Sequence, residues 1–247
     1  MANKCTEINR CNQRGGRMLS IVDLLEAGSL PEDIAVYLMA AVNQKKVSFM
    51  VGANPGGAGK TTVMGALLNL VPSSYQLLPA ATLKTLEKGR DNHAGTPKCW
   101  ICHEISSGPY YAYLWGKEAR AFFEMSDYGH LLATNLHSDT YEQAYEQICH
   151  DNGVPDRYFY RMHLQIYLKL ERQGLGRVAR KINTVYESTG DSEHKLMYDD
   201  EGSSFLHPAE VSQLVSENEF QHTHKQLEAI RQRNLNRIEQ IDDFMAM

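Results

Sequence analysis

The 247-residue chain lacks the sequence features of several large classes of protein. No apolar run approaches the roughly 20 residues of a membrane-spanning helix, and the polar N-terminus shows no apolar signal-peptide core. Basic residues are not in excess, because 25 lysines and arginines stand against 30 aspartates and glutamates and give a net charge of −5. These absences argue against a membrane-spanning, exported or general nucleic-acid-binding protein. We therefore expect a cytoplasmic protein with no nucleic-acid partner.

Cysteine is scarce as well, with five residues in the chain. An odd number of cysteines in a cytoplasmic protein indicates reduced thiols rather than a disulfide framework. Cys99, Cys102 and His103 have the spacing C-x-x-C-H of c-type haem attachment sites, and a zinc or redox pair is a further alternative. Haem attachment normally follows export, for which the sequence gives no signal. These residues also lead directly into Glu104. The remainder of the sequence favours a strand that ends at a catalytic carboxylate over a haem or metal site at this place.

Residues 47–70 carry the clearest chemical signal in the chain. A short apolar run leads into a glycine-rich turn, and an apolar helical pattern follows, which is the layout of a phosphate-binding loop. In such a loop, backbone N–H groups and the helix N-terminus surround phosphate oxygens. Lys60 would reach the β- and γ-phosphates, and the Thr61 hydroxyl would bind Mg²⁺. The residues expected to hold a nucleotide are Asn54, Pro55, Gly56, Gly57, Ala58, Gly59, Lys60, Thr61 and Thr62.

One position departs from the pattern G-x-x-x-x-G-K-[ST]. Asn54 occupies the place of the first glycine, five residues before Gly59. Asparagine tolerates left-handed backbone conformations better than most residues, and Gly56 and Gly57 add further freedom. Two alternatives to a working loop stay open, namely a glycine-rich turn that binds no ligand and a loop that binds a nucleotide poorly.

The periodicity of the remaining sequence predicts an α/β domain. We expect residues 1–17 to form a flexible arm, residues 18–210 the main domain and residues 211–247 a C-terminal helix. Besides the elements of the phosphate loop, the patterns predict helices at residues 18–27, 31–44, 84–90, 117–125 and 140–149, and short buried strands at residues 99–103 and 131–135.

The last third of the domain alternates in the manner of strands. Residues 162–170 place apolar and polar side chains on opposite faces, which predicts a half-buried strand. Strands at 178–187, 195–198 and 204–206 would join it in an antiparallel appendage over about residues 162–206. Helical periodicity then predicts one long helix over residues 217–244.

Two polar side chains follow buried strands and are candidates for catalysis. Glu104 closes the strand 99–103, and His137 follows the strand 131–135. Ligands bind at the carboxyl ends of strands in open α/β sheets, where an acid can position Mg²⁺ or polarise the attacking water. His137 could contact the γ-phosphate. The plainer alternatives are a solvated glutamate at a strand end and a structural histidine.

The order of these features resembles the type II/type IV secretion-system ATPase family, the motors of pilus, archaellum and secretion machines, and especially its VirB-type and archaeal branch. The likeness covers about residues 18–210. Residues 18–72 resemble the lead-in helices, strand, phosphate loop and following helix of that family. ICHEI around Glu104 resembles the catalytic-glutamate motif of the family, and Lys117-Glu118-Ala119-Arg120 resembles the segment that follows it. Gly129-His130 with LLATNLHSDT resembles the histidine box. GLGRVARKINTVYE at residues 174–187 resembles the C-terminal hairpin.

The resemblance implies a fold, a chemistry and partners. The fold would be an α/β P-loop NTPase (RecA-like) core with a C-terminal antiparallel β-hairpin appendage and a terminal helix. ATP and Mg²⁺ would be the cofactors, Thr61 and Glu104 the Mg²⁺ ligands, with Glu104 orienting the attacking water. His137 would read the γ-phosphate, and Glu118 would support the Mg²⁺ shell or a subunit contact. The protein would be an ATP-hydrolysing motor subunit in a homo-oligomeric ring, a hexamer in the family, with arginine fingers from the neighbouring subunit. It would act on a membrane platform protein at the inner face of the cell membrane.

Several departures from the family pattern keep other hypotheses open. His103 stands where the family has a glycine, the acidic box before the catalytic glutamate is not recognisable, and residues 105–116 look like an aromatic insertion. A degenerate paralogue that binds nucleotide and regulates assembly with little hydrolysis is therefore one alternative. A P-loop kinase of small molecules is another, although residues 105–125 lack the arginine-rich lid that it would need.

Overall fold

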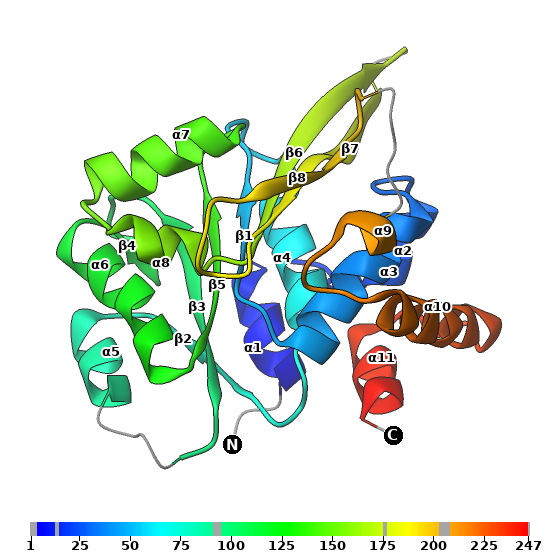
Figure 1. Ribbon diagram of the computed structural model, residues 1–247, viewed down its shortest axis with the longest axis horizontal. Coiled ribbons are helices and arrows are strands. Elements are labelled where there is room, and N and C mark those ends of the chain that lie inside the picture. Colours follow the sequence, from blue (N-terminus) through cyan, green and yellow to red (C-terminus); the bar gives the residue numbers. More distant parts are fainter. Residues whose placement is uncertain (1–3, 13–14, 91–94, 175–176, 203–207, 247) are drawn as a thin grey trace.

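A parallel sheet organises the protein, which we describe from a computed structural model covering residues 4–12, 15–90, 95–174, 177–202 and 208–246. Its strands lie in the order β2-β3-β5-β1-β6-β7-β8, and the short β4 pairs with β3 outside this row (Figure 1). The pairs from β2 to β6 are parallel, while β7 and β8 are added antiparallel. The strands are β1 (Phe49–Gly52), β2 (Gln76–Pro79), β3 (Lys98–Ile105), β4 (Tyr113–Leu114), β5 (Leu131–Leu136), β6 (Leu164–Gln173), β7 (Arg177–Glu187) and β8 (Lys195–Asp199).

The central strands are mainly apolar because both faces of the sheet are covered. All residues of β1, β3 and β5 are buried. Alternate residues of a strand point to opposite faces, so Phe49 and Val51 join one hydrophobic cluster and Met50 joins the other.

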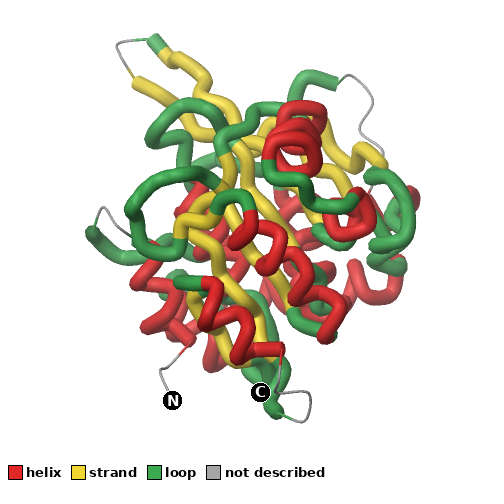
Figure 2. The backbone as a smooth tube through the Cα atoms, turned by 90° about the vertical axis from the view of Figure 1, so that its left-hand side faces the viewer, coloured by secondary structure: helices red, strands yellow, loops and turns green. Residues whose placement is uncertain are grey.

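Two layers of helices cover these faces (Figures 1 and 2). The layer beside the first cluster comprises α1 (Lys4–Cys11), α2 (Ile21–Glu26), α3 (Glu32–Ala40), α4 (Lys60–Leu68), α10 (Glu217–Gln232) and α11 (Ile238–Met245), with α9 (Pro208–Val211) next to α3. The opposite layer comprises α5 (Leu83–Arg90), α6 (Lys117–Glu124), α7 (Tyr141–Tyr145) and α8 (Asp156–Tyr160). Short π or 3-10 turns continue three of the helices, namely Ala41–Lys45 after α3, Met125–Tyr128 after α6 and Glu146–Asp151 after α7. None of the helices in the described ranges combines the length and the apolar character needed to cross a membrane.

The N-terminus differs from the predicted flexible arm of residues 1–17, because α1 packs into the core. Cys5, Ile8 and Cys11 recur at every third position and so share one face of the helix, and each is at most 5% exposed. Lys4 Nζ also forms an ion pair with Asp242 Oδ1 at 2.6 Å, which links the two ends of the chain. The sequence prediction failed here because the helix is short and mostly polar.

The antiparallel appendage predicted at residues 162–206 is part of the central sheet instead. β6 pairs in parallel with β1, the strand that leads into the phosphate loop. Its first five residues are all buried, so this strand is covered on both faces rather than half-buried as predicted. Only the distal part of the β6–β7 hairpin extends beyond the helices (Figure 2). The strand predicted at residues 204–206 lies outside the described residues.

The helix predicted at residues 217–244 is broken into α10 and α11. Asn234 adopts a left-handed conformation with φ 53°, which an α-helix cannot continue. The apolar stripe survives the break, since Leu227, Ile230, Ile238 and Ile241 are all buried in the first cluster. The apolar spacing therefore predicts the buried face of both helices correctly. It does not predict the break at Asn234, because the break leaves that spacing unchanged.

Candidate functional site

The phosphate loop joins β1 to α4 in the centre of the sheet. Gly57 and Gly59 have φ values of 86° and 102°, which favour glycine. Asn54 is not in this left-handed region, so the position needs no glycine, and the backbone tolerance that we invoked for asparagine is not used. Its backbone N–H instead donates to Asp139 Oδ1 at 2.6 Å, which ties the loop to the end of β5.

Lys60 is the first residue of α4 and lies at the centre of a polar cluster. Its Nζ donates to Ala53 O at 2.8 Å and lies 3.3 Å from Glu104 Oε1 and 3.1 Å from His137 Nδ1. Glu104 sits near the end of β3 and His137 directly after β5. The structure thus brings together the three side chains predicted from the carboxyl ends of parallel strands.

Burial dominates the electrostatics of the pair formed by Lys60 and Glu104. The two side chains are 10% and 9% exposed. Loss of water lowers the pKa of Lys60, and the nearby Glu104 carboxylate opposes this shift. Burial likewise raises the pKa of Glu104, against the opposing charges of Lys60 and His137. A phosphate group that enters the loop therefore competes with Glu104 for the same ammonium.

His137 borders this pair and is more accessible, with 44% of its side chain exposed. His137 Nδ1 lies 3.1 Å from Lys60 Nζ and 3.3 Å from Asn54 O. It can accept from the ammonium in one tautomer or donate to the carbonyl oxygen in the other. Nε2 lies 3.7 Å from Glu104 Oε1. His137 is therefore placed where it contacts the lysine and the carboxylate together.

Asn135 is a further polar residue at this place, and the sequence analysis missed it. It lies on β5, is 1% exposed, and its Nδ2 donates to His103 O on the neighbouring β3 at 3.0 Å. Its Oδ1 is buried and has no hydrogen-bond partner among the described residues. The available signal was a polar side chain inside the buried run LLATNL. We call Lys60, Glu104 and Asn135 the floor of the site.

A cavity of about 650 Å³ opens above the floor, within the range of about 300–1,000 Å³ that is typical of small-molecule sites. Besides the floor, the phosphate loop lines it from Pro55 to Met64, and His137 lies at its edge. Residues 178–182 of β7 line another side and are called the hairpin wall below. A third side contains Cys11, Asn12, Gly15, Arg17, Met18, Leu19, Leu24, Ala27 and Ser29. Neither of these two sides was predicted from the sequence.

Two of the predicted site residues do not line this cavity. Asn54 is exposed beside the loop, and its backbone N–H and carbonyl oxygen meet Asp139 and His137. Glu118 lies in the first turn of α6, in the opposite helix layer, and is absent from the cavity lining within the described residues. The structure therefore does not bring Glu118 to the phosphate loop, and its role in a subunit contact stays a prediction.

The cavity lining fits Mg²⁺ bound together with a nucleotide. Mg²⁺ is usually held by one or two carboxylates with phosphates and water, rather than by a cage of protein ligands. Thr61 lines the cavity in the first turn of α4, and Glu104 lines it near the end of β3, with Oε1 3.3 Å from Lys60 Nζ. In the part of the chain that the structure describes, no group of three or more His, Cys, Asp or Glu could hold a metal by itself.

The C-x-x-C spacing at Cys99 and Cys102 does not form a paired site. The two residues are three apart on β3, so their side chains point to opposite faces, and they belong to different hydrophobic clusters. All five cysteines are free and buried, as the prediction of reduced thiols requires. Burial raises the pKa of Cys102 to about 12. A zinc, redox or haem interpretation is therefore wrong for this pair.

The fold and the floor together define a class of protein. A mostly parallel sheet carries helices on both faces, a glycine-rich loop joins its central strand to a helix, and a lysine and a glutamate converge beside that loop. These features fit a P-loop NTPase-like core, as the sequence predicted.

Comparison with known proteins finds similar solved structures, among them three ATPase chains. No family model and no curated protein matches the chain. The VirB11 ATPase from the Brucella suis type IV secretion system is similar over 68% of this chain and 54% of its own, with 21% identity and a TM-score of 0.46. The ATPase DotB from Yersinia pseudotuberculosis is similar over 85% and 60%, with 12% identity and a TM-score of 0.46. DotB from Legionella pneumophila is similar over 88% and 59%, with 11% identity and a TM-score of 0.41.

The solved structures that the chain resembles at low identity thus include an ATPase of a type IV secretion system, the kind of protein that the motifs predicted. The chain spans between about half and three fifths of the length of the solved chains that it matches. Such a likeness does not say what this chain binds or does, which depends on the residues of the cavity.

Proposed function

We propose that the chain binds ATP with Mg²⁺ in the cavity and hydrolyses it as a motor subunit of a secretion or type IV pilus-like machine. One observation carries this proposal: Lys60 Nζ and Glu104 Oε1 lie 3.3 Å apart beside the glycine-rich loop. This distance supports the proposal, because a phosphate-binding cation and a carboxylate that can act on water would both lie within reach of the same γ-phosphate.

The side chains of the site take separate roles in this reaction. The backbone N–H groups of the loop and the N-terminus of α4 hold the phosphates, while Lys60 moves from Glu104 to the β- and γ-phosphates. Glu104, freed from the lysine, orients the attacking water and accepts its proton, for which a pKa raised by burial is favourable. His137 contacts the γ-phosphate. Thr61 and Glu104 would hold Mg²⁺, which would supply positive charge to neutralise the charge that develops on the phosphates.

Assembly and location follow from the resemblance of the motifs rather than from the geometry of one chain. The subunits form a homo-oligomeric ring, a hexamer in the family, and Glu118 is available for a contact between them. The ring acts on a membrane platform protein at the cytoplasmic face of the membrane. Size measurement by light scattering with and without ATP tests the ring, and a protein that stays monomeric with ATP bound contradicts it.

The function itself is tested by ATP binding and turnover of the wild type and of Lys60→Ala. Lys84→Ala is the matched control, because Lys84 is exposed on α5 and does not line the cavity. We expect Lys60→Ala to lose tight binding and turnover, and Lys84→Ala to retain both. Equal binding by the wild type and Lys60→Ala would contradict the proposal.

The same assays separate the two alternatives. Binding that depends on Lys60 without any turnover by the assembled protein indicates a nucleotide-binding regulatory or assembly subunit. Transfer of the γ-phosphate to an added small-molecule acceptor, in place of release as inorganic phosphate, indicates a kinase.

A further inference from the structure

Arg180 of the hairpin wall touches the phosphate loop. Arg180 on β7 donates from Nε to Gly57 O at 2.7 Å. Arg180 also lies against Gly59, the residue directly before Lys60. If Gly59 carried a Cβ, that atom would lie 3.5 Å from Cδ of Arg180. Arg180 therefore lies across both left-handed glycines of the loop, although 123 positions separate it from Gly57.

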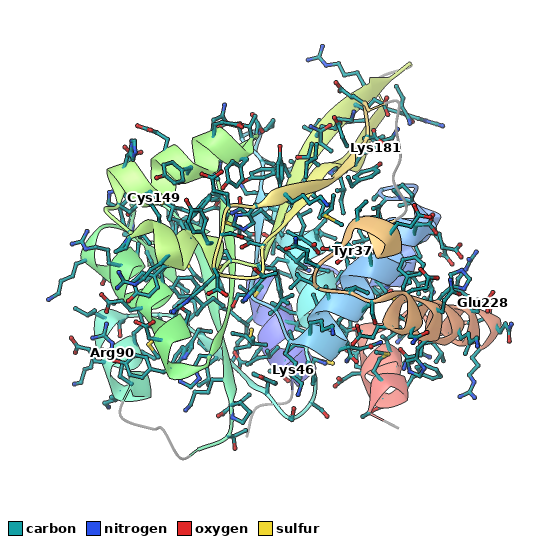
Figure 3. All side chains as sticks on the ribbon, viewed as in Figure 1. Tyr37, Lys46, Arg90, Cys149, Lys181 and Glu228 are labelled. Carbon is teal, nitrogen blue, oxygen red and sulfur yellow. The ribbon has the colours of Figure 1, made fainter. Side chains whose placement is uncertain are left out.

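Most of the hydrogen-bonding capacity of this guanidinium is unused. Arginine carries five N–H donors, and the structure assigns one of them, to Gly57. Among the described residues no carboxylate pairs with Arg180, which is exposed and lines the cavity. The adjacent Lys181, labelled on the hairpin in Figure 3, is instead paired with Glu171 at 2.8 Å. Arg180 is thus a cation of the hairpin wall that is free to meet an anion in the cavity.

The sheet fixes where this arginine stands. β6, the partner of β7, pairs in parallel with β1, and Tyr167 lies opposite Gly52 at the end of β1. The two strands are so close there that a Cβ on Gly52 would lie 2.7 Å from the Tyr167 ring. Leu170 on β6 then pairs with Arg180 on β7. The strand that leads into the loop and the strand that carries Arg180 are therefore joined through β6 within the same chain.

We propose that Arg180 is a phosphate-binding residue of its own chain, which bridges from Gly57 O to the phosphate chain of the bound nucleotide. The proposal rests on the proposed function and extends it, since the family resemblance implies arginines only from a neighbouring subunit. Guanidinium groups suit this position because they bind phosphate oxygens through parallel N–H donors. Arg180 would also hold the loop by its carbonyl before the nucleotide arrives.

The test is binding of a fluorescent ATP analogue, mant-ATP with Mg²⁺, to dilute wild type, Arg180→Ala and Arg180→Lys. We expect binding to Arg180→Ala to be about ten- to one-hundredfold weaker, the loss expected for hydrogen bonds to a charged group. Arg180→Lys keeps the charge but not the paired donors, so its affinity should lie between the other two. The matched control is Arg177→Ala, which removes an exposed arginine of the same strand outside the cavity lining.

Two results overturn the proposal. One is an Arg180→Ala protein that binds mant-ATP as tightly as Arg177→Ala does, while Lys60→Ala still abolishes binding. The other is recovery of turnover on mixing Arg180→Ala with Lys60→Ala, because recovery means that the arginine acts on a neighbouring subunit. Absence of any Lys60-dependent binding in the wild type is a different outcome, which removes the proposed function as well. Thermal unfolding of each variant shows whether the hairpin remains folded.

Discussion

The floor and the hairpin wall face each other across one cavity and differ in how they are held. Floor side chains are at most 10% exposed and are fixed by Ala53 O, by His103 O and by the ion pair between Lys60 and Glu104. On the hairpin wall, Arg180 is exposed and Val178 is 43% exposed, and Arg180 meets the loop through one hydrogen bond. Buried groups have strong electrostatic interactions and are costly to disturb, whereas exposed ones can shift without much cost. We infer that the floor supplies the chemistry and that the hairpin wall supplies adjustable binding.

The largest expected effect comes from the carboxylate of the floor. Glu104→Gln keeps the size of the side chain but removes the base, so turnover should fall about 10²- to 10⁴-fold while ATP remains bound. Glu118→Gln is the control, because Glu118 lies outside the cavity, and in dilute protein its ATP binding should not change. Both are measured by phosphate release and by equilibrium ATP binding. If Glu104→Gln leaves turnover unchanged, the inference that the floor supplies the chemistry is wrong.

The base of the hairpin is expected to respond to pH. Burial lowers the pKa of His163 to about 4, and the positive Arg161 adds to the shift while Asp191 opposes it. Burial also lowers the pKa of His194 to about 4; its hydrogen bond to Met162 O opposes the shift, and His163 adds to it. Both histidines are thus neutral in the folded protein at pH values where they are charged in the unfolded chain.

The sign follows from proton linkage. Between about pH 6.5 and 4 the unfolded state binds more protons, so stability is fully present above pH 6.5 and is lost as the pH falls. From pH 7 to pH 5 each histidine should remove about 2 kcal/mol of unfolding free energy, measured by urea unfolding. His163→Gln should flatten this dependence, and His222→Gln, at an exposed position on α10, should not. Stability that is independent of pH in this range would contradict the assignment.

A smaller effect is expected from Asn135, which links two strands at the floor. Asn135→Ala leaves His103 O without its donor, which should cost about 1–3 kcal/mol of unfolding free energy. If Asn135 Oδ1 also meets the ligand or its water, turnover per bound ATP falls as well. Asn236→Ala, at an exposed position between α10 and α11, is the control and should change stability by less than about 0.5 kcal/mol. An Asn135→Ala protein as stable as this control would show that the floor is less rigid than its burial indicates.

The smallest effect belongs to the hairpin wall. Val178→Ala removes two methyl groups from a side chain that is 43% exposed, so unfolding free energy should change by less than about 0.5 kcal/mol. Hydrogen exchange supplies a second measure, since β7 near Val178 should exchange faster than β1, β3 and β5. Slow exchange throughout the hairpin would mean that wall and floor are equally rigid.

The sequence predicted those parts of the site that depend on local rules. Glycine spacing located the loop, and the common edge of parallel strands brought Glu104 and His137 to Lys60. The N-terminal side of the cavity and Arg180 could not be predicted, because their positions depend on the packing of α1 and on the pairing of β6 with β1. Glu118 was placed at the site by resemblance alone, and its helix belongs to the opposite layer. At Asn54 the backbone is not left-handed, so this position needs no glycine.

The most direct single measurement is a crystal structure with Mg²⁺ and a non-hydrolysable ATP analogue. We predict triphosphate in the loop, Lys60 Nζ on the phosphates rather than on Glu104, and a guanidinium nitrogen of Arg180 from the same chain within hydrogen-bond distance of a phosphate oxygen. A nucleotide bound outside this cavity, or a cavity in which Lys60 remains paired with Glu104 at saturating analogue, would contradict this prediction.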